Sequence, residues 1–225
     1  MKHLAQIARR AAALVLTLAL TAALALPGFA AGSIPAQEEV AQVITALGIM
    51  AGDAGGDLRL SRTVTRAEFI TMAVKASPQG DQVGEASTSP YPDVPYTHWA
   101  AGFVEAGVAA GLISGYSDGT FRPASSITLA EGATIALGLL GYSAEANASW
   151  PTGAIRTATE LGLDRGLNIA VPSAAVTRGQ AAVLFSRMLA ITPKGGEKPY
   201  AQALGTLVED VIILSTNATI NGQSG

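Results

Sequence analysis

Apolar residues recur at helical spacing in three segments of the chain. In each segment they lie at or close to positions i, i+3, i+4 and i+7, which places them on one face of a helix. The three sets are Val40, Val43, Ile44 and Leu47; Trp99, Phe103, Ala106 and Ala110; and Ala181, Leu184, Phe185 and Met188. This spacing predicts amphipathic helices whose apolar stripes face one another, with Trp99 as a core anchor.

The same order of features occurs three times along the chain. A helix-like segment ends in a Gly-apolar-x-x-Gly stop, and a loop then leads to a second helix that opens with Thr65, Thr128 or Thr177. The stops are residues 48–52, 111–115 and 162–166, and the distance from the first Gly to the Thr is 17, 17 and 15 residues. This regularity predicts a repeat protein. Its repeats span residues 36–76, 91–142 and 148–191.

Each second helix carries the sequence signature of a capping box. The Thr hydroxyl accepts from the backbone N–H three residues later, and a Glu or Gln at that position reaches back to the Thr N–H. The residues in question are Glu68, Glu131 and Gln180. Glycines 48, 111 and 162 are predicted to end the first helices, because glycine tolerates a left-handed backbone there.

A basic residue stands at the first helical position of two repeats, Arg66 and Arg178. A cation there faces the positive end of the helix dipole and does little for stability. A guanidinium beside free N–H groups would instead suit a carboxylate or phosphate. The alternative is a solvated side chain that binds nothing. On either interpretation we expect both arginines at the surface.

The first 31 residues have the layout of a secretory signal peptide. Lys2, Arg9 and Arg10 precede an apolar run over residues 11–26, which Pro27 and Gly28 interrupt. The run is shorter than the roughly 20 residues of a membrane span. Residues 1–31 are therefore predicted to be cleaved, leaving an exported chain with no membrane span.

Composition excludes several functional classes. Without the predicted signal, 11 basic residues stand against 17 acidic ones, a net charge of −6, so no nucleic acid is expected as a partner. The absence of cysteine excludes disulfides and thiolate metal sites. In residues 200–225, the run Val211 to Leu214 predicts a β segment that starts a further segment or tail.

One motif points superficially to an enzyme. Residues 115–119 match the G-x-S-x-G nucleophile elbow, which needs a preceding strand and a later His. Here the motif follows a helix stop, and His98 lies upstream. We therefore expect an ordinary turn, no catalytic residue, no metal and no cofactor.

The central repeat resembles the S-layer homology domain almost throughout. The matching segments are Tyr91-Pro92-Asp93-Val94, His98-Trp99-Ala100, residues 111–115, residues 116–123 and Ile127-Thr128. The first repeat keeps residues 48–52 and 65–68, and the third keeps Trp150, residues 162–166 and Thr177-Arg178. The resemblance covers roughly residues 36–191.

The resemblance implies an all-α fold of three helix-loop-helix repeats in a pseudo-threefold bundle. It also implies non-covalent anchoring of a secreted or S-layer protein to the cell wall, through grooves that bind a pyruvylated secondary cell-wall polysaccharide. The implied ligands of the glycan carboxylate are Arg66 and Arg178, whereas Leu129 in the second repeat weakens or silences its groove. The implied groove lining is Trp99, Trp150, Gly52, Gly115 and Gly166.

Four alternatives remain open from sequence. The chain could be the anchor portion of a secreted hydrolase, or it could bind peptidoglycan directly. Self-assembly into a lattice is also left open. A sugar-stacking role of Trp99 or Trp150 is the alternative to a core position, because aromatic faces pack against apolar groups.

Overall fold

The computed structural model describes residues 37–167 and 171–204 of the 225-residue chain. The helices in these ranges are α2 (Gln37–Ala46), α3 (Arg66–Lys75), α4 (Ala101–Ala109), α5 (Leu129–Leu139), α6 (Ser143–Asn147), α7 (Thr152–Leu161), α8 (Arg178–Ala190) and α9 (Tyr200–Ala203). Isolated β-bridges, and no sheet, join the described segments, which confirms the all-α prediction. The predicted signal peptide and the predicted β segment lie outside the described residues.

The three predicted helix pairs are α2 with α3, α4 with α5, and α7 with α8. The first helices are followed or capped by Gly48, Gly111 and Gly162, whose φ angles are +75°, +67° and +75°. A side chain would strain the backbone there, so glycine fits. The second helices each begin with a complete capping box. Both predictions about helix ends are confirmed.

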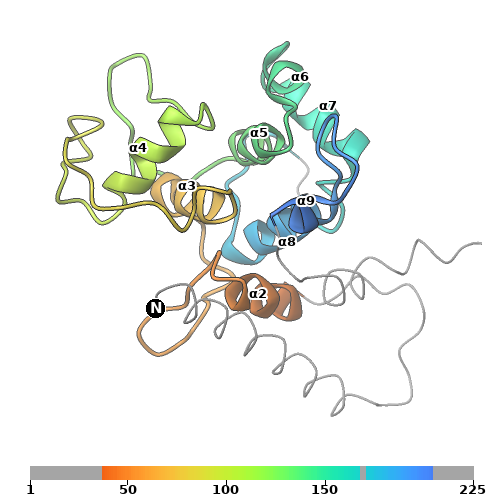
Figure 1. The fold of residues 1–225 in the computed structure, drawn as a ribbon, viewed down its shortest axis with the longest axis horizontal. Helices are drawn as coiled ribbons and strands as arrows, with labels where there is room; N and C mark the ends of the chain where they lie inside the picture. The colour runs from red at the N-terminus through yellow and green to blue at the C-terminus, as the bar shows by residue number, and fades with distance from the viewer. Residues whose placement is uncertain (1–36, 168–170, 205–225) are drawn as a thin grey trace, which may run out of the picture.

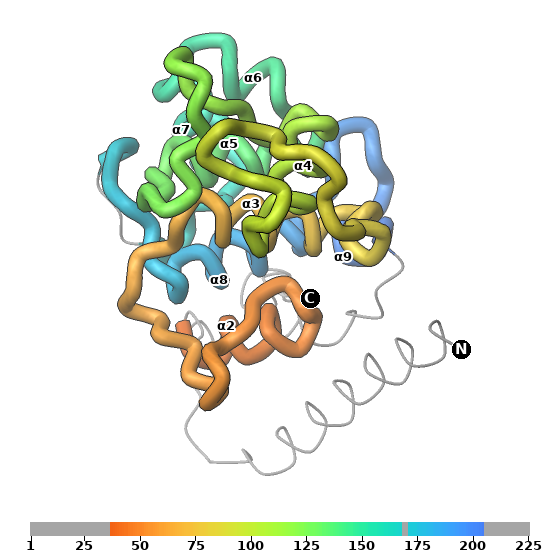
Figure 2. Tube along the Cα trace, turned by 90° about the vertical axis from the view of Figure 1, so that its left-hand side faces the viewer, coloured from red at the N-terminus to blue at the C-terminus, as the bar shows by residue number. Residues whose placement is uncertain are grey.

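Each first helix packs on the second helix of a different repeat. Helix α4 contacts α3, α7 contacts α5, and α2 contacts α8. Figures 1 and 2 both show α2 beside α8, although these helices come first and last among the three pairs. The repeats therefore interlock in a closed cycle.

A ring of three backbone hydrogen bonds lies at the centre of this cycle. The N–H of Val64 donates to the carbonyl of Val176 at 2.8 Å, that of Val176 to Ile127 at 3.0 Å, and that of Ile127 to Val64 at 2.9 Å. All three residues are fully buried. They precede the helix-opening Thr of their repeats by one residue. The ring marks a pseudo-threefold axis.

The neighbouring repeat also completes the first turn of each second helix. The N–H of Arg66 donates to Ser125, that of Leu129 to Ala174, and that of Arg178 to Arg62, at 2.8, 2.9 and 2.8 Å. These N–H groups have no partner within their own helix. The packing of one repeat against the next therefore also supplies the acceptors for the first-turn N–H groups of each second helix.

The three second helices carry one large and two small residues at the equivalent position, which is a level of the core. Phe69, Gly132 and Ala181 each stand four residues after the helix-opening Thr. Phe69 contacts Phe185 with ring centroids 5.1 Å apart. A Cβ added to Gly132 would lie 3.0 Å from Cζ of Phe69. A second bulky residue at this level would therefore overpack the core.

The predicted apolar stripe of the second repeat is wrong. Helix α4 begins at Ala101, so Trp99 precedes it and is 60% exposed instead of anchoring the core. The buried face consists of Ala101, Val104 and Gly107. Gly107 is needed because Ile70 packs so closely that an added Cβ would lie 2.5 Å from its Cγ1 atom. The spacing of the large apolar residues gave the wrong buried face for α4, because mainly small residues pack against α3.

Replacement of Phe69 by Ala should lower the free energy of unfolding of the whole domain by about 3–5 kcal/mol. The side chain is fully buried where helices of all three repeats meet. Urea titration followed by circular dichroism should show one transition at a lower midpoint. The exposed substitution Glu39→Ala is the control. A biphasic curve with one phase at the wild-type midpoint would show that the repeats unfold separately.

Candidate functional site

Arg66 lies in a contact between the first and second repeats, here called the 1–2 contact. Its Nε donates to the carbonyl of Phe121 at 2.9 Å, and its Nη2 to that of Ser114 at 3.0 Å. Its Nη1 forms an ion pair with Glu131 at 2.7 Å. Only 3% of Arg66 is exposed, so the expectation of a surface residue is wrong. Its partners are 48 to 65 residues away in sequence.

Arg178 makes the corresponding contact between the third and first repeats, here called the 3–1 contact. Its Nε donates to the carbonyl of Leu58 at 2.6 Å, and its Nη2 donates to that of Ala51. Glu68 lies 3.8 Å from its Nη1. The residue is 7% exposed, and burial lowers the pKa of its guanidinium. Two of the three repeats thus use one arrangement.

The 2–3 contact, between the second and third repeats, contains neither the buried arginine nor the glutamate of the other two contacts. Leu129 stands where the other contacts have Arg, and Gln180 stands where they have Glu. Leu129 is buried, and Nε2 of Gln180 donates to the carbonyl of Leu167 at 3.0 Å. Because an unpaired buried charge is costly, the loss of both partners preserves the fold where the loss of one would not.

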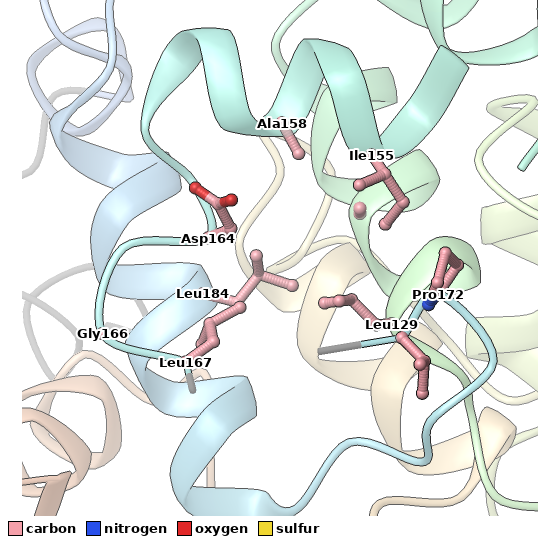
Figure 3. A pocket seen from close by; sticks show the side chains of 10 residues that line it. Leu129, Ile155, Ala158, Asp164, Gly166, Leu167, Pro172 and Leu184 are labelled. Atoms are coloured by element: carbon pink, nitrogen blue, oxygen red, sulfur yellow. The ribbon is translucent and has the colours of Figure 1, made fainter. Parts of the chain in front are cut away.

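A pocket of about 390 Å³ lies at the 2–3 contact (Figure 3). Its lining is mostly apolar and comes from α5, α7, α8 and the segments beside Leu167 and Pro172. Asp164 is the charged residue of the lining, and its Oδ2 accepts from the Thr159 hydroxyl at 2.6 Å. The residues that line it are Leu129, Ala133, Ile155, Ala158, Asp164, Gly166, Leu167, Val171, Pro172 and Leu184.

Two exposed arginines that sequence reasoning missed lie in the loops of the charged contacts. Arg59 and Arg122 each stand six residues before the helix-opening Thr. Their φ angles are +47° and +59°, a left-handed backbone that residues other than glycine rarely adopt. Their side chains are 57% and 48% exposed. The equal distance from Thr65 and Thr128 was the signal available in the sequence.

The buried and the exposed arginine of the 1–2 contact both lie over the same aromatic ring. The guanidinium carbon of Arg122 lies 4.0 Å from the centroid of the Tyr116 ring, and that of Arg66 lies 4.7 Å from it. The Tyr116 hydroxyl donates to Glu131 at 3.3 Å. Burial raises the pKa of Tyr116, although the charge of Arg66 acts against it. The tyrosine ring therefore contacts two cations.

Asp93 fixes the backbone that carries Arg122. Its carboxylate accepts from the N–H groups of Phe121 and Arg122 at 2.8 and 2.7 Å. Burial alone would raise the pKa of Asp93, but these two hydrogen bonds lower it below its usual value. The Asp of the Tyr91-to-Val94 motif thus orients the loop of its own repeat.

The three glycines predicted to line grooves occupy positions that favour glycine for different structural reasons. An added Cβ on Gly115 would lie 2.3 Å from Cε1 of Tyr91, whose hydroxyl accepts from the Gly115 N–H. On Gly52 it would lie 2.8 Å from the backbone of Gly56. Gly166 has a φ of +85° and lines the pocket of the 2–3 contact. At the first two, close approach of the chain demands glycine.

Trp99 and Trp150 both lie exposed just before a first helix, at α4 and α7 respectively. Trp99 stacks near the His98 ring with centroids 5.6 Å apart. Nδ1 of His98 accepts from the N–H of Ala100 at 3.1 Å. The histidine therefore orders the start of α4, which agrees with a structural role.

The described residues contain no group of three or more side chains suited to hold a metal ion. Within the same ranges, no helix has the length and hydropathy to cross a membrane. The segment that matches the nucleophile elbow is a turn, in which the Gly119 N–H donates to the Tyr116 carbonyl at 2.9 Å. This agrees with the sequence interpretation of that motif.

Comparison with known proteins connects this geometry to a family. The model of the S-layer homology domain matches residues 90–132. The middle cell wall protein of Brevibacillus brevis is 36% identical over 144 residues, 63% of this chain and 13% of that protein. The surface layer protein of Brevibacillus choshinensis is 36% identical over 135 residues, 59% of this chain and 12% of that protein.

An enzyme is also among the relatives. The exoglucanase XynX of Acetivibrio thermocellus is 29% identical over 170 residues, 68% of this chain and 15% of that protein. The chain therefore spans less than a sixth of the length of these three relatives.

Replacement of Arg66 by Met should lower the free energy of unfolding by about 3 kcal/mol or more. Methionine keeps the apolar stem but leaves Glu131 without its ion-pair partner and two carbonyls without their donor. Arg122→Met is the matched control, since Arg122 is exposed and its ion pair is solvated. Urea titration should detect a change in the first variant alone. Equal effects of the two substitutions would contradict a structural role for Arg66.

Proposed function

Because residues 90–132 match the model of the S-layer homology domain, we propose that the chain anchors a secreted or S-layer protein to the bacterial cell wall without a covalent bond. Two relatives with 36% identity are named as a cell wall protein and a surface layer protein. A cell-surface location agrees with the predicted signal peptide. The described part of the chain offers a rigid, closed scaffold for such binding.

The proposed ligand is a pyruvylated secondary cell-wall polysaccharide, whose ketal carries a carboxylate. The observation that supports an acidic ligand is the placement of Arg66 and Arg178 at equivalent inter-repeat contacts. A guanidinium has five N–H donors. Among the described residues, three of those on Arg66 donate to the partners named above. A guanidinium suits a carboxylate because it can donate two parallel hydrogen bonds to it.

A second candidate is supported by the similarity to exoglucanase XynX. In that case this chain is the anchor of a secreted hydrolase whose catalytic domain lies elsewhere. The wall-binding chemistry is the same under both candidates, and only the anchored protein differs. Direct binding of peptidoglycan is the competing chemistry, and it needs no acidic polymer.

Co-sedimentation with purified cell walls of the source bacterium tests this proposal. The chain should pellet with native walls and remain in the supernatant with walls whose secondary polymer has been removed by acid. Pelleting should weaken as salt increases, because the contact with a carboxylate is electrostatic.

Heat-unfolded chain serves as the control for non-specific adsorption. Equal pelleting with stripped walls would favour peptidoglycan as the ligand. Failure to pellet with native walls would overturn the anchoring function itself.

A further inference from the structure

The chain after α8 folds back onto the bundle. The N–H of Tyr200 donates to the carbonyl of Ile191 at 2.9 Å, and helix α9 packs against α8 (Figure 1). Tyr200 and Ala201 are 6% and 4% exposed. Burial raises the pKa of the Tyr200 hydroxyl to about 12, which agrees with a ring withdrawn from water. Residues 191–204, here called the latch, are therefore part of the packed domain.

The latch also contacts the second repeat and the short helix that follows it. The N–H of Lys194 donates to the carbonyl of Leu140 at 2.9 Å. Its Nζ forms an ion pair with Glu145 of α6 and lies 5.7 Å from the centroid of the Tyr142 ring. Gly141 has a φ of +84°, and a Cβ there would lie 3.4 Å from Cβ of Lys194. The latch thus joins the end of the third repeat to the end of the second.

The repeats that the latch joins are those of the 2–3 contact. The other two contacts each hold a buried arginine opposite a glutamate. The 2–3 contact has Leu129 and Gln180 instead, and it contains the pocket of about 390 Å³. Empty space deprives the side chains around it of packing partners. The hollow, uncharged contact is therefore the one that the latch spans.

Helices α5 and α8 are held at both ends by this arrangement. At their starts, the N–H of Val176 donates to the carbonyl of Ile127 at 3.0 Å. At their C-terminal ends, the latch begins at Ile191, which follows α8, and bonds to Leu140, which follows α5. Both helices line the pocket between these two points. Release of the latch would free one end of each helix and leave the other end bonded.

Two different interactions hold the latch in place. The ion pair between Lys194 and Glu145 is solvent-exposed, so it adds little stability and mainly fixes how the latch is seated. Burial of Tyr200 contributes more, because an aromatic side chain removes a large apolar area from water. Like charges in place of the ion pair would therefore lift the latch without removing its packed residues.

We propose that the latch keeps the 2–3 contact closed and that this contact opens first when the latch is released. With the latch seated, α5 and α8 stay together along their whole length. With the latch lifted, they splay from their C-terminal ends, and the pocket opens to solvent while the other two contacts hold. The inference concerns the conformation of the domain and does not depend on the proposed function.

Thiol labelling of the full chain with an aromatic disulfide reagent measures this opening, because the chain has no cysteine of its own. Ala133→Cys places a reporter on α5, at a buried position in the lining of the pocket. Val104→Cys places a second reporter on the buried face of α4, which packs on α3. Lys194→Glu sets a like charge against Glu145. It should raise the labelling rate about three- to tenfold at the first cysteine and leave the second within about twofold.

Lys198→Glu is the matched control, because it makes the same charge change at an exposed residue of the latch. It should label like wild type. Lys194→Glu combined with Glu145→Lys restores opposite charges and should restore the slow rate. Tyr200→Ala removes the buried ring and should raise the rate at the pocket cysteine about tenfold or more.

Equal acceleration at both cysteines would overturn the inference, because the latch would then contribute only to the stability of the whole domain. The inference also fails if Lys194→Glu labels no faster than Lys198→Glu, or if the exchanged charges do not restore the slow rate.

Discussion

The ring of hydrogen bonds among Val64, Ile127 and Val176 sets the geometry on which the other contacts depend. It brings the start of each second helix against the loop of another repeat, so first-turn N–H groups find acceptors there. The same approach carries Arg66 and Arg178 to carbonyls far away in sequence. A repeat on its own would have neither the ring nor these partners, and its amphipathic helices would stay partly uncovered.

Three-fold closure does not make the three contacts alike. Two contain a buried Arg opposite a Glu, and the third contains Leu129 opposite Gln180. A buried ion pair can be replaced by neutral groups with little loss, whereas removal of one partner leaves a costly charge. The two positions are therefore coupled. Arginine at position 129 alone would face an amide and not a carboxylate, so it would not recreate the charged contact.

Features set by neighbouring residues could be predicted from the sequence, whereas contacts between residues far apart in the chain could not. Capping boxes and glycine helix ends follow from neighbouring residues, and the structure confirms them. The burial of Arg66 could not be predicted from its neighbours in sequence, because its hydrogen-bond partners come from another repeat. The α4 face was missed because Gly107 and alanines form it instead of large residues. The positive φ of Arg59 and Arg122 has no signature in residue type, since glycine is the usual choice.

Native-state hydrogen exchange at the three ring amides tests the central claim most directly. If the ring closes the domain, the N–H groups of Val64, Ile127 and Val176 can open only when all repeats separate. Their exchange free energies should then be equal to one another and to the global free energy of unfolding. A markedly lower value at any one of the three would contradict the account, because one contact would then open while the rest of the domain stayed folded.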